Sequence, residues 1–431
     1  MKNSVKNTVL NFDDAFEIVM SSARRLGTER VGIDRALNRI LAEDVISDID
    51  IPPFNKSAMD GFACRRADLA NELSIIETIP AGYAPGKSIG TNQCAKIMTG
   101  AVVPEGADCV IMVEYTENTA ENRIRFTGST TNNNICLRAE DTKKGDVVLR
   151  AGEIIKAEHI AVLATVGCIK PSVALQPRVG IIATGDELVE PSRKPTACQI
   201  RNSNAFQLAA QVTGANAIAT NYGIAADTKE AIDAMFKKGI RQNDVVILSG
   251  GVSVGDCDFV REVLKENNVR LLFEKVAVKP GRPTVFGILN QKSEVRSQKP
   301  EIRSQKSEVR SQKPESVLCP LSSVFCFGLP GNPASTFIMF ELLVKPFLYK
   351  MTGHDFKPVV SHMQLESTIT RKKTKRDSWL PVIFKENGKI ASIEYHGSAH
   401  INALCEADGL ICMPTGVAEI KEGTTVAVRQ I

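Results

Sequence analysis

Three glycine-rich turns follow short apolar stretches of the chain, and each turn opens an expected helix. They have the sequences TGDEL, SGGVSVGDCD and GLPGNPAS and begin at Thr184, Ser249 and Gly328. Glycine lets the backbone approach an anion closely, and the first N–H groups of a helix are free to bind it. One such turn is a weak indication, because helix starts use these residues anyway. Three of them at one sheet edge predict a ligand that carries phosphate.

Four carboxylates fall at or just beyond the expected strand ends, namely Glu187, Asp227, Asp256 and Asp258. Asp227 and Asp256 each precede an expected helix, where a carboxylate also serves as a cap, so capping and function stay equal alternatives for these two. For Glu187 and Asp258 the functional interpretation is favoured. A hard cation such as Mg²⁺ prefers carboxylate and phosphate oxygens, and we expect Glu187, Asp256 and Asp258 to hold one.

Two lysines, Lys275 and Lys279, stand four residues apart in the run KVAVKPGRP. If this run is extended, both side chains lie on one face, because side chains along a strand alternate with a period of two. Two ammonium groups on one face suit an oxyanion or a polyphosphate. The alternative is an ordinary exposed strand face, but Pro280 and Gly281 shape the segment into a loop, which argues against it.

Three tracts in the first third of the chain place polar residues beside apolar runs. Asp60 precedes Gly61, Thr99 stands in the sequence MTGA, and Arg138 is followed by Asp141 in the sequence RAED. Each tract is weak individually, and an Asp-Gly pair also fits an ordinary turn.

The elements that must position the three turns alternate between strand and helix. Strands are expected at residues 179–183, 217–220, 245–248, 270–273, 284–289 and 324–327, and helices at 204–212, 229–238, 259–266 and 334–349. Such alternation predicts a doubly wound, mostly parallel sheet with helices on both faces. Ligands of these sheets bind outside the carboxyl ends of the strands, which is where the turns stand.

The rest of the chain divides into smaller parts, so the expected fold class is a multidomain α/β protein. An N-terminal helix is predicted with a capping box at Asp14 and Glu17. Short strands separated by turns predict an inserted β module and a small C-terminal β domain. The expected boundaries are 1–50 plus 139–172 for an N-terminal linker and dimerisation domain, 51–138 for the β module, 173–357 for the α/β domain and 358–431 for the C-terminal domain.

Residues 290–317 do not fit the α/β pattern. They contain the seven-residue repeat QKSEVRS, which has one apolar residue per repeat and therefore no coiled-coil seam. We expect a solvated low-complexity insertion between two strands.

Composition excludes several classes of protein. The chain has 431 residues, of which 43% are hydrophobic and 24% charged, as in ordinary globular proteins. A net charge of +4 does not predict binding to nucleic acid or to a membrane surface. No apolar run reaches the ~18 residues of a membrane span, and the N-terminus is not a signal peptide, so a cytoplasmic protein is expected. The 11 cysteines form no C-x-x-C pair and fit buried thiols better than a zinc site.

Taken together, these tracts resemble the molybdopterin molybdenumtransferase family, which includes bacterial MoeA and the E domain of gephyrin. The matching tracts occur in family order across nearly the whole chain. They are Pro53 with Ser57–Gly61, Met98–Ala101, Arg138 with Glu140 and Asp141, Ala183–Leu188, Ser249–Gly255, Lys279–Gly281 and Leu329–Pro333.

The resemblance implies an enzyme that takes adenylylated molybdopterin (adenylyl-molybdopterin) and molybdate, cleaves the pyrophosphate bond with Mg²⁺, inserts molybdenum at the dithiolene and releases AMP. It also implies a homodimer whose cleft is shared between the α/β domain of one subunit and the β module of the other. An upstream pterin adenylyltransferase and downstream molybdoenzymes would be its protein partners.

The resemblance also assigns roles to single residues. The catalytic residues would be Asp60, Glu187, Asp258, Lys275 and Lys279. Glu187, Asp256 and Asp258 would be the metal ligands. The residues that would bind the pterin nucleotide or molybdate are Thr99, Arg138, Asp141, Thr184, Gly185, Asp227, Ser249, Gly250, Gly251, Ser253, Gly255, Pro280, Gly281, Pro330, Gly331, Asn332, Pro333 and Ser398.

One departure and two rival functions remain. Asn202 stands where many family members have Asp, which indicates a cap instead of a metal or base role. The main rival is a non-catalytic pterin-binding scaffold, because gephyrin's E domain docks receptor peptides. Loss of the site carboxylates or lysines would favour a scaffold, but they are present. A pterin-adenylylating enzyme or a nucleotide amidase would lack the additional β domains.

Overall fold

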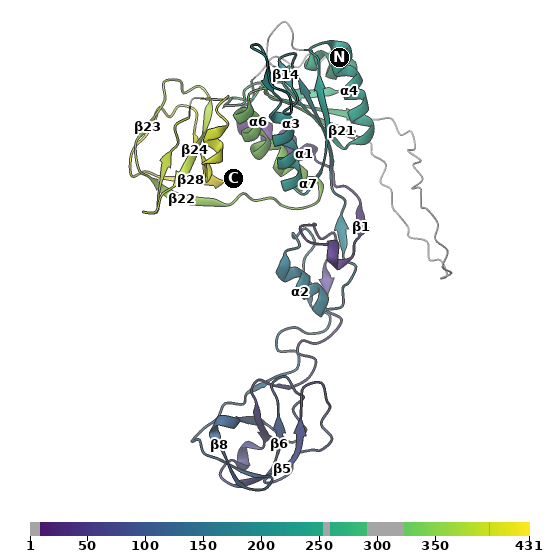
Figure 1. Cartoon of the computed structure of the whole chain (residues 1–431), viewed down its shortest axis with the longest axis vertical. Coiled ribbons are helices and arrows are strands. Elements are labelled where there is room, and N and C mark those ends of the chain that lie inside the picture. Colours follow the sequence, from purple (N-terminus) through teal and green to yellow (C-terminus); the bar gives the residue numbers. More distant parts are fainter. Residues whose placement is uncertain (1–8, 253–258, 291–322, 396) are drawn as a thin grey trace, which may run out of the picture. The chain divides into compact units, whose positions relative to one another are not determined.

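The computed structural model describes residues 9–252, 259–290, 323–395 and 397–431 and divides into two compact units (Figure 1). Unit 1 comprises Met1–Arg30, Asn38–Ala42 and Ser172–Ile431, and unit 2 comprises Val31–Leu37 and Glu43–Pro171. Several predicted features lie outside the described residues, namely positions 291–317 of the insertion and Ser253, Gly255, Asp256 and Asp258.

The core of unit 1 is a six-stranded sheet with the strand order β16-β13-β17-β21-β20-β18. β13 pairs in parallel with β16 and β17, β17 pairs in parallel with β21, and the β21–β20 and β20–β18 pairings are antiparallel. The expected parallel sheet is therefore confirmed for the strands that carry the turns. The bounds are β13 Arg178–Thr184, β16 Ile218–Ala225, β17 Val245–Ser249, β18 Arg270–Phe273, β20 Val285–Asn290 and β21 Ser323–Leu329.

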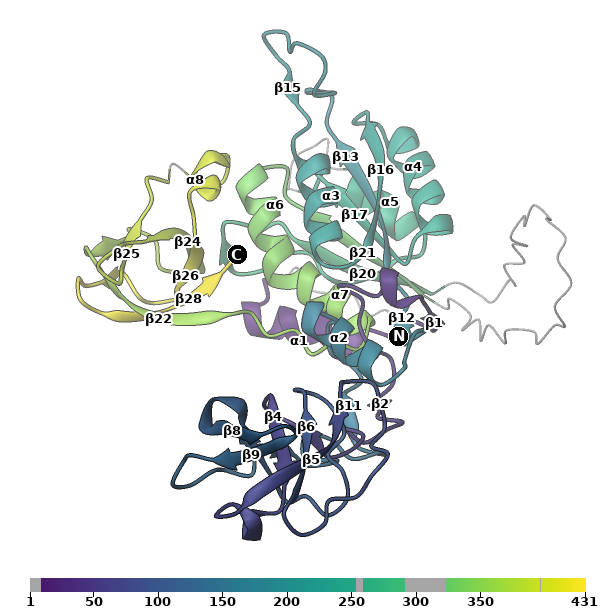
Figure 2. The ribbon, with the colours of Figure 1, turned by 60° about the horizontal axis from the view of Figure 1, so that its bottom comes forward.

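Helices cover both faces of this sheet, with α3 and α6 on one side and α4 and α5 on the other (Figure 2). On the second side, Phe236 of α4 and Val263 of α5 share an apolar cluster with Val246 of β17. Within the described ranges, no helix is both long and apolar enough to span a membrane. The bounds are α3 Asn204–Gly214, α4 Lys229–Gln242, α5 Val260–Glu266 and α6 Pro333–Met339.

The expectation of one regular α-helix over residues 334–349 is wrong, because the helix is interrupted. α6 is followed by a π-helical turn, Phe340–Val344, and then by α7, Lys345–Met351. Pro346 has no N–H to donate to a carbonyl one turn earlier, so regular α-helical hydrogen bonding does not run through this point.

The first helix also begins differently from the prediction. α1 spans Phe12–Ser22, and its cap is Asn11, whose side chain accepts a hydrogen bond from Asp14 N at 2.7 Å. Asn11 Nδ2 in turn donates to the Asp14 carboxylate at 2.9 Å. The capping box predicted at Asp14 and Glu17 is therefore wrong: the helix is capped three residues earlier, where Asn11 satisfies one of its first free N–H groups.

The C-terminal part of unit 1 is a closed β structure. β24 pairs with β25 and β26, β22 pairs with β25 and β28, and β26 pairs with β28, so five strands form a ring. The short strand β19, Val278–Lys279, adds to it in parallel with β24. The bounds are β22 Val360–Leu365, β24 Asp377–Phe384, β25 Lys389–Ser392, β26 Gly409–Met413 and β28 Thr425–Gln430.

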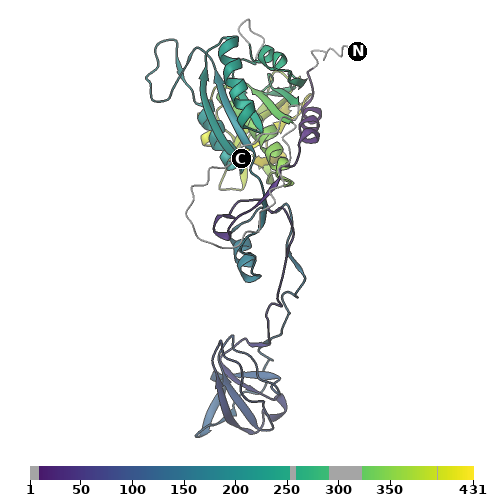
Figure 3. The ribbon, with the colours of Figure 1, turned by 90° about the vertical axis from the view of Figure 1, so that its right-hand side faces the viewer.

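Unit 2 contains the expected β module as a six-stranded sheet of order β7-β4-β6-β5-β9-β8 (Figure 3). The rest of unit 2 holds a helix, α2, and the short paired strands β2 and β11. The bounds are β2 Val45–Ile46, β4 Gly61–Cys64, β5 Glu72–Ile79, β6 Gln93–Ile97, β7 Cys109–Met112, β8 Thr116–Ala120, β9 Arg123–Phe126, β11 Val147–Leu149 and α2 Ala157–Thr165.

Three cysteines lie in one row of this module. Cys64 on β4 stands directly opposite Cys94 on β6 and Cys109 on β7, and the Sγ atoms of Cys64 and Cys109 are 3.7 Å apart. All three are buried as free thiols, and burial raises the pKa of Cys94 to about 12. Cys198 and Cys405 are exposed, so the expectation of buried thiols holds for only part of the chain.

Candidate active site

The three glycine-rich turns meet at the carboxyl edge of the unit 1 sheet. They follow β13, β17 and β21, which are parallel neighbours. Gly250 N, in the turn after β17, donates to Leu329 O at the end of β21 at 3.1 Å. A Cβ built on Gly331 would lie 3.6 Å from Gly250 Cα, so these two turns are in contact. The sequence prediction that the turns share one sheet edge agrees with this geometry.

The turn after β17 lies against the end of β13 and requires glycine there. Gly250 has φ +98°, and a Cβ on it would lie 2.5 Å from Thr184 O. Gly251 has φ +59°, and its Cβ would lie 2.9 Å from Thr184 Oγ1. Positive φ strains an L side chain, and the close approach leaves no room for one. The backbone N–H groups of this turn are therefore not covered by side chains of its own glycines.

Asn204, the first residue of α3, links two of the turns. Its Nδ2 donates to Ser249 Oγ at 2.9 Å and to Gly331 O at 2.7 Å. The sequence analysis did not select this residue, although it belongs to the run RNSN. The neighbouring Asn202 Oδ1 accepts from Ala205 N at 3.2 Å, which agrees with the expected capping role.

Carboxylates border the same edge. Asp227 N donates to Asp186 Oδ1 at 3.0 Å, and Asp186 N donates to Asp227 Oδ2 at 3.4 Å, so the turns after β13 and β16 are tied together. The cap of α4 is Thr228, not Asp227, because Thr228 Oγ1 accepts from Ala231 N. The capping alternative for Asp227 is therefore wrong, and its carboxylate instead orders this edge.

Glu187 is exposed and folds back over Gly185, where its carboxylate takes the space of a Cβ. Among the residues that the structure describes, no group of three or more His, Cys, Asp or Glu side chains is arranged to hold a metal ion. Asp256 and Asp258 lie outside that part of the chain, so the metal site stays a prediction.

The lysine segment runs past the end of the sheet and joins the C-terminal strands. Val276 and Val278 are buried, whereas Lys275 is half-buried and Lys279 is exposed, so burial alternates as in an extended chain. Lys279 pairs with Ser378 of β24. Pro280 is buried, and Gly281 lies against Met339 of α6.

Two arginines extend this positive segment, and sequence reasoning missed both. Arg376 Nη1 donates to Val278 O at 3.4 Å, next to Lys279. Burial lowers the pKa of Arg376, and the positive charge of Arg282 lowers it further, so the two guanidinium groups are near each other. The only signal in the sequence is the basic run RKKTKR that ends at Arg376. Lys279, Arg282 and Arg376 are called the cationic segment below.

The turn after β21 contacts the C-terminal domain through Ser398. Asn332 Nδ2 donates to Ser398 Oγ at 2.7 Å, and Ala334 N donates to Ser398 O at 3.1 Å. Thr336 Oγ1 donates to Pro330 O and fixes the turn from the α6 side. The predicted residues Pro330, Asn332 and Ser398 are thus brought together.

The predicted residues of the first third belong to unit 2 and form two clusters there. Asp60 Oδ1 accepts from both N and Oγ1 of Thr99, each at 2.6 Å. These two hydrogen bonds lower the pKa of Asp60, the side-chain bond having the larger effect. Asp60 is exposed and stays ionised near neutral pH.

Arg138 forms the second cluster. Its Nε donates to Asp50 Oδ2 at 2.6 Å, and Lys144 N donates to Asp50 Oδ1 at 2.9 Å. The Lys144 bond first, and the Arg138 bond second, lower the pKa of Asp50. Asp141 is exposed, and its N donates to Ile51 O at 3.0 Å. Arg138 is therefore held by an ion pair within unit 2, with most of its side chain exposed.

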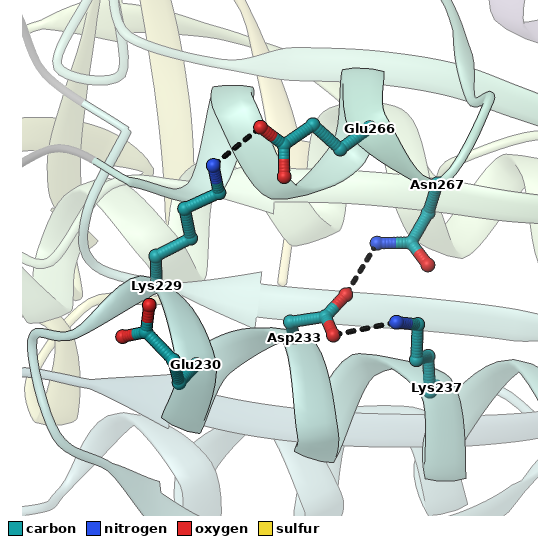
Figure 4. Close-up of a pocket in the computed structure, with 6 residues that line it drawn as sticks. All are labelled: Lys229, Glu230, Asp233, Lys237, Glu266 and Asn267. Carbon is teal, nitrogen blue, oxygen red and sulfur yellow. Dashed lines mark hydrogen bonds and ion pairs between the residues drawn. The ribbon is translucent and has the colours of Figure 1, made fainter.

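A polar hollow of about 260 Å³ lies between α4 and α5 (Figure 4). Two ion pairs lie in it: Lys229 with Glu266, and Lys237 with Asp233 at 2.7 Å. Asn267 Nδ2 also donates to Asp233 at 2.7 Å. These contacts link the two helices, and we assign this hollow a structural role.

Comparisons with known proteins cover the whole architecture. Residues 10–167 match the family model of the MoeA N-terminal region (domain I and II), residues 180–350 match a probable molybdopterin binding domain, and residues 365–431 match the MoeA C-terminal region (domain IV). The molybdopterin molybdenumtransferase of Staphylococcus aureus (strain COL) is 32% identical over 439 residues, covering 98% of this chain and 96% of the relative. That of Staphylococcus epidermidis (strain ATCC 12228) is 33% identical over 450 residues, with the same coverage.

Solved structures agree. The molybdopterin biosynthesis moeA protein from Pyrococcus horikoshii OT3 is 27% identical, with a TM-score of 0.79 over 98% of this chain and 100% of that chain. The matches therefore extend over the β module, the α/β domain and the C-terminal domain alike. On these grounds, the chain belongs to the MoeA family.

Proposed function

We propose that this protein transfers molybdenum to molybdopterin. It takes adenylylated molybdopterin and molybdate, cleaves the pyrophosphate bond, releases AMP and leaves molybdenum on the dithiolene. The observation that carries the proposal is the meeting of the glycine-rich turns at one sheet edge of unit 1, in the family whose members are named for this transfer.

The turn at Gly250 and Gly251 fits the pyrophosphate of the pterin nucleotide. Neither residue has a side chain; Gly250 N–H is bonded to Leu329 O, and an oxyanion can approach Gly251 N–H. Donors fixed in place before the reaction stabilise charge as it develops on the phosphate oxygens, without reorganising during the reaction.

The cationic segment fits molybdate, which is a dianion. Lys279 is exposed, and Arg376 is held beside it by its bond to Val278 O. Burial lowers the pKa of Arg376, and the positive charge of Arg282 lowers it further; an anion between the two guanidinium groups would relieve their repulsion. Arginine also offers paired N–H donors that match oxyanions.

The carboxylates at the sheet edge fit Mg²⁺. Glu187 and Asp227 are oxygen ligands of the kind that this ion prefers, and we propose that Glu187 holds it together with Asp256 and Asp258. When bound, the ion would withdraw electron density from the phosphate bridge as a Lewis acid.

We also propose that the enzyme works in the cytoplasm as a homodimer, with Asp60 and Thr99 of one subunit facing the turns of the other. Unit 2 exposes apolar side chains that suit a second copy: Ile46 is 57% exposed, Val147 41% and Ile169 64%. Ile46 and Val147 are direct cross-strand partners, so they form one patch. An adenylyltransferase upstream and molybdoenzymes downstream would supply the substrate and take the product.

The test is insertion in vitro, with adenylylated molybdopterin, Mg²⁺ and molybdate, and AMP release as the measured quantity. We expect Lys279→Ala and Asp60→Ala to lose most activity and to remain folded dimers, because both side chains are exposed. Lys237→Ala is the matched control, since this lysine is paired in the α4–α5 hollow, and it should keep wild-type rates. If the wild type binds the pterin nucleotide but releases no AMP, the chain is a pterin-binding scaffold.

A further inference from the structure

Asn204 is fixed in one orientation by its contacts with the two turns. Its Nδ2 donates to Gly331 O, and a backbone carbonyl can only accept, so the NH₂ end of the amide must face Gly331. Oδ1 is then an acceptor that finds no donor among the described residues, and it is buried. The two ends of an amide are about 2 Å apart by their bond lengths, so Oδ1 lies within roughly 5 Å of Gly331 O.

A second buried oxygen without a partner lies at the same edge. Thr184 Oγ1 has no hydrogen-bond partner in the described part of the chain, and Thr184 is only 3% exposed. It lies under the turn after β17, since the Cβ positions of both Gly250 and Gly251 would be 2.9 Å from it. Ser249, at the start of this turn, is bonded to Asn204. The two unpaired oxygens therefore border one turn.

Buried polar groups are nearly always hydrogen-bonded, and leaving one unpaired is unfavourable. Two such oxygens beside the Gly251 amide indicate a donor that the described residues do not supply. A phosphate cannot be that donor at neutral pH, because its ionised oxygens only accept. Gly250 N–H is already bonded to Leu329 O, so Gly251 N–H is the donor of these two that remains for the anion, and the two oxygens suit a neutral donor group of the ligand.

We propose that Asn204 Oδ1 and Thr184 Oγ1 accept hydrogen bonds from an N–H or O–H group of the pterin nucleotide. This inference rests on the proposed function and makes Asn204 a binding residue of that site. The same amide holds the turns after β17 and β21 at a fixed separation. Asn204 would therefore both bind the ligand and position the turn that faces its anionic group. The pterin ring and the adenosine both carry such donors.

Thr184→Val is the most informative variant. It replaces the hydroxyl by a methyl group of the same shape, and the hydroxyl makes no bond that the described residues could lose. The thermal stability of the free protein should therefore stay the same or rise, because an unpaired buried polar group is removed. Binding of the nucleotide should weaken by about tenfold or more, because the ligand's donor is then left unpaired.

Asn204→Ala should weaken binding at least as much. Its matched control is Gln211→Ala on the same helix. Gln211 Nε2 donates to Phe337 O and Glu341 Oε1, so this amide also ties α3 to the α6 side, but these two partners lie outside the turns. The control should bind as the wild type does. Binding is measured without molybdate and Mg²⁺, so that no turnover occurs, with adenylylated molybdopterin, molybdopterin alone and AMP alone as probes.

The probe whose affinity falls in Thr184→Val identifies the part of the nucleotide that supplies the donor. Equal binding by Thr184→Val, Asn204→Ala and the wild type overturns the proposal. A loss of stability in Thr184→Val also overturns it, because it would show that the Thr184 hydroxyl has a hydrogen-bond partner in the free protein, such as a buried water. These results do not depend on turnover: a wild type that binds but releases no AMP contradicts the proposed function and leaves this inference standing.

Discussion

Replacing Gly250 by alanine tests how closely the turn after β17 is held against β13. Gly250 has φ +98°, and a Cβ there would lie 2.5 Å from Thr184 O and 2.9 Å from Thr184 Oγ1. The first of these neighbours is backbone in a central parallel strand, so it cannot rotate away as a side chain can. The variant must therefore move the turn, strain the strand, or both.

The magnitude follows from two contributions. An L side chain in the left-handed region costs roughly 1–2 kcal/mol. Forcing an atom into a packed region costs about 1–3 kcal/mol more. We expect Gly250→Ala to lower the free energy of unfolding of unit 1 by about 2–5 kcal/mol and to abolish binding of the pterin nucleotide.

Urea unfolding followed by tryptophan fluorescence measures this, because Trp379 is the only tryptophan and packs in unit 1 beside Ile338 of α6. Gly388→Ala is the control for strain alone: its φ is +75°, and nothing lies within 4 Å of its Cβ position. It should lose only about 1–2 kcal/mol. Equal losses in Gly250→Ala and Gly388→Ala would refute the close contact between the turn and Thr184.

Four further results are expected. Thr99→Val should raise the pKa of Asp60, measured by a carboxyl NMR titration. A lowered carboxyl pKa stabilises the folded state only above the unfolded value near 4. The variant should therefore be less stable than the wild type near neutral pH and equally stable below that range. Asp233→Asn should cost at most about 1 kcal/mol in urea unfolding and leave AMP release unchanged, whereas a loss of activity would place the α4–α5 hollow in the site. Cys94, whose pKa burial raises to about 12, should resist a thiol reagent at pH 8 until urea unfolds the protein. Its contribution to stability is present below the unfolded pKa near 8.5 and should fall as the pH rises toward 12. Rapid labelling of the folded protein would contradict its burial. Arg376→Gln should weaken molybdate binding by about tenfold or more in calorimetry, and an unchanged affinity would remove this arginine from the anion site.

The sheet and its turns could be predicted because their signals are local. An apolar run such as Val245–Ser249 followed at once by two glycines indicates a buried strand and a tight turn within a few residues of sequence. Parallel order then brings the ends of β13, β17 and β21 to one edge without further information. The irregularity at Phe340–Val344 interrupts an apolar pattern that continues through it, so Pro346 is the only local residue that indicates it.

The residues that tie the site together could not be predicted, because their contacts are remote in sequence. Asn204 bonds Ser249 and Gly331, which are 45 and 127 residues away. Arg376 reaches Val278 across 98 residues, through the parallel pairing of β19 with β24. Nothing in the neighbourhood of either residue distinguishes it from a helix-start amide or a surface charge. Their importance appears only when the fold places Asn204 beside the turns and Arg376 beside Lys279.

We propose that the turns of the unit 1 sheet and the cationic segment bind the anions of one substrate complex. Tungstate has the charge and shape of molybdate and scatters X-rays anomalously, so crystals of the full chain grown with tungstate and adenylylated molybdopterin locate the anion directly. We predict a tungsten peak within hydrogen-bonding reach of Lys279 and Arg376, with the pyrophosphate on the amide of Gly251. Tungsten bound only elsewhere, for example in the hollow between α4 and α5, would contradict the account.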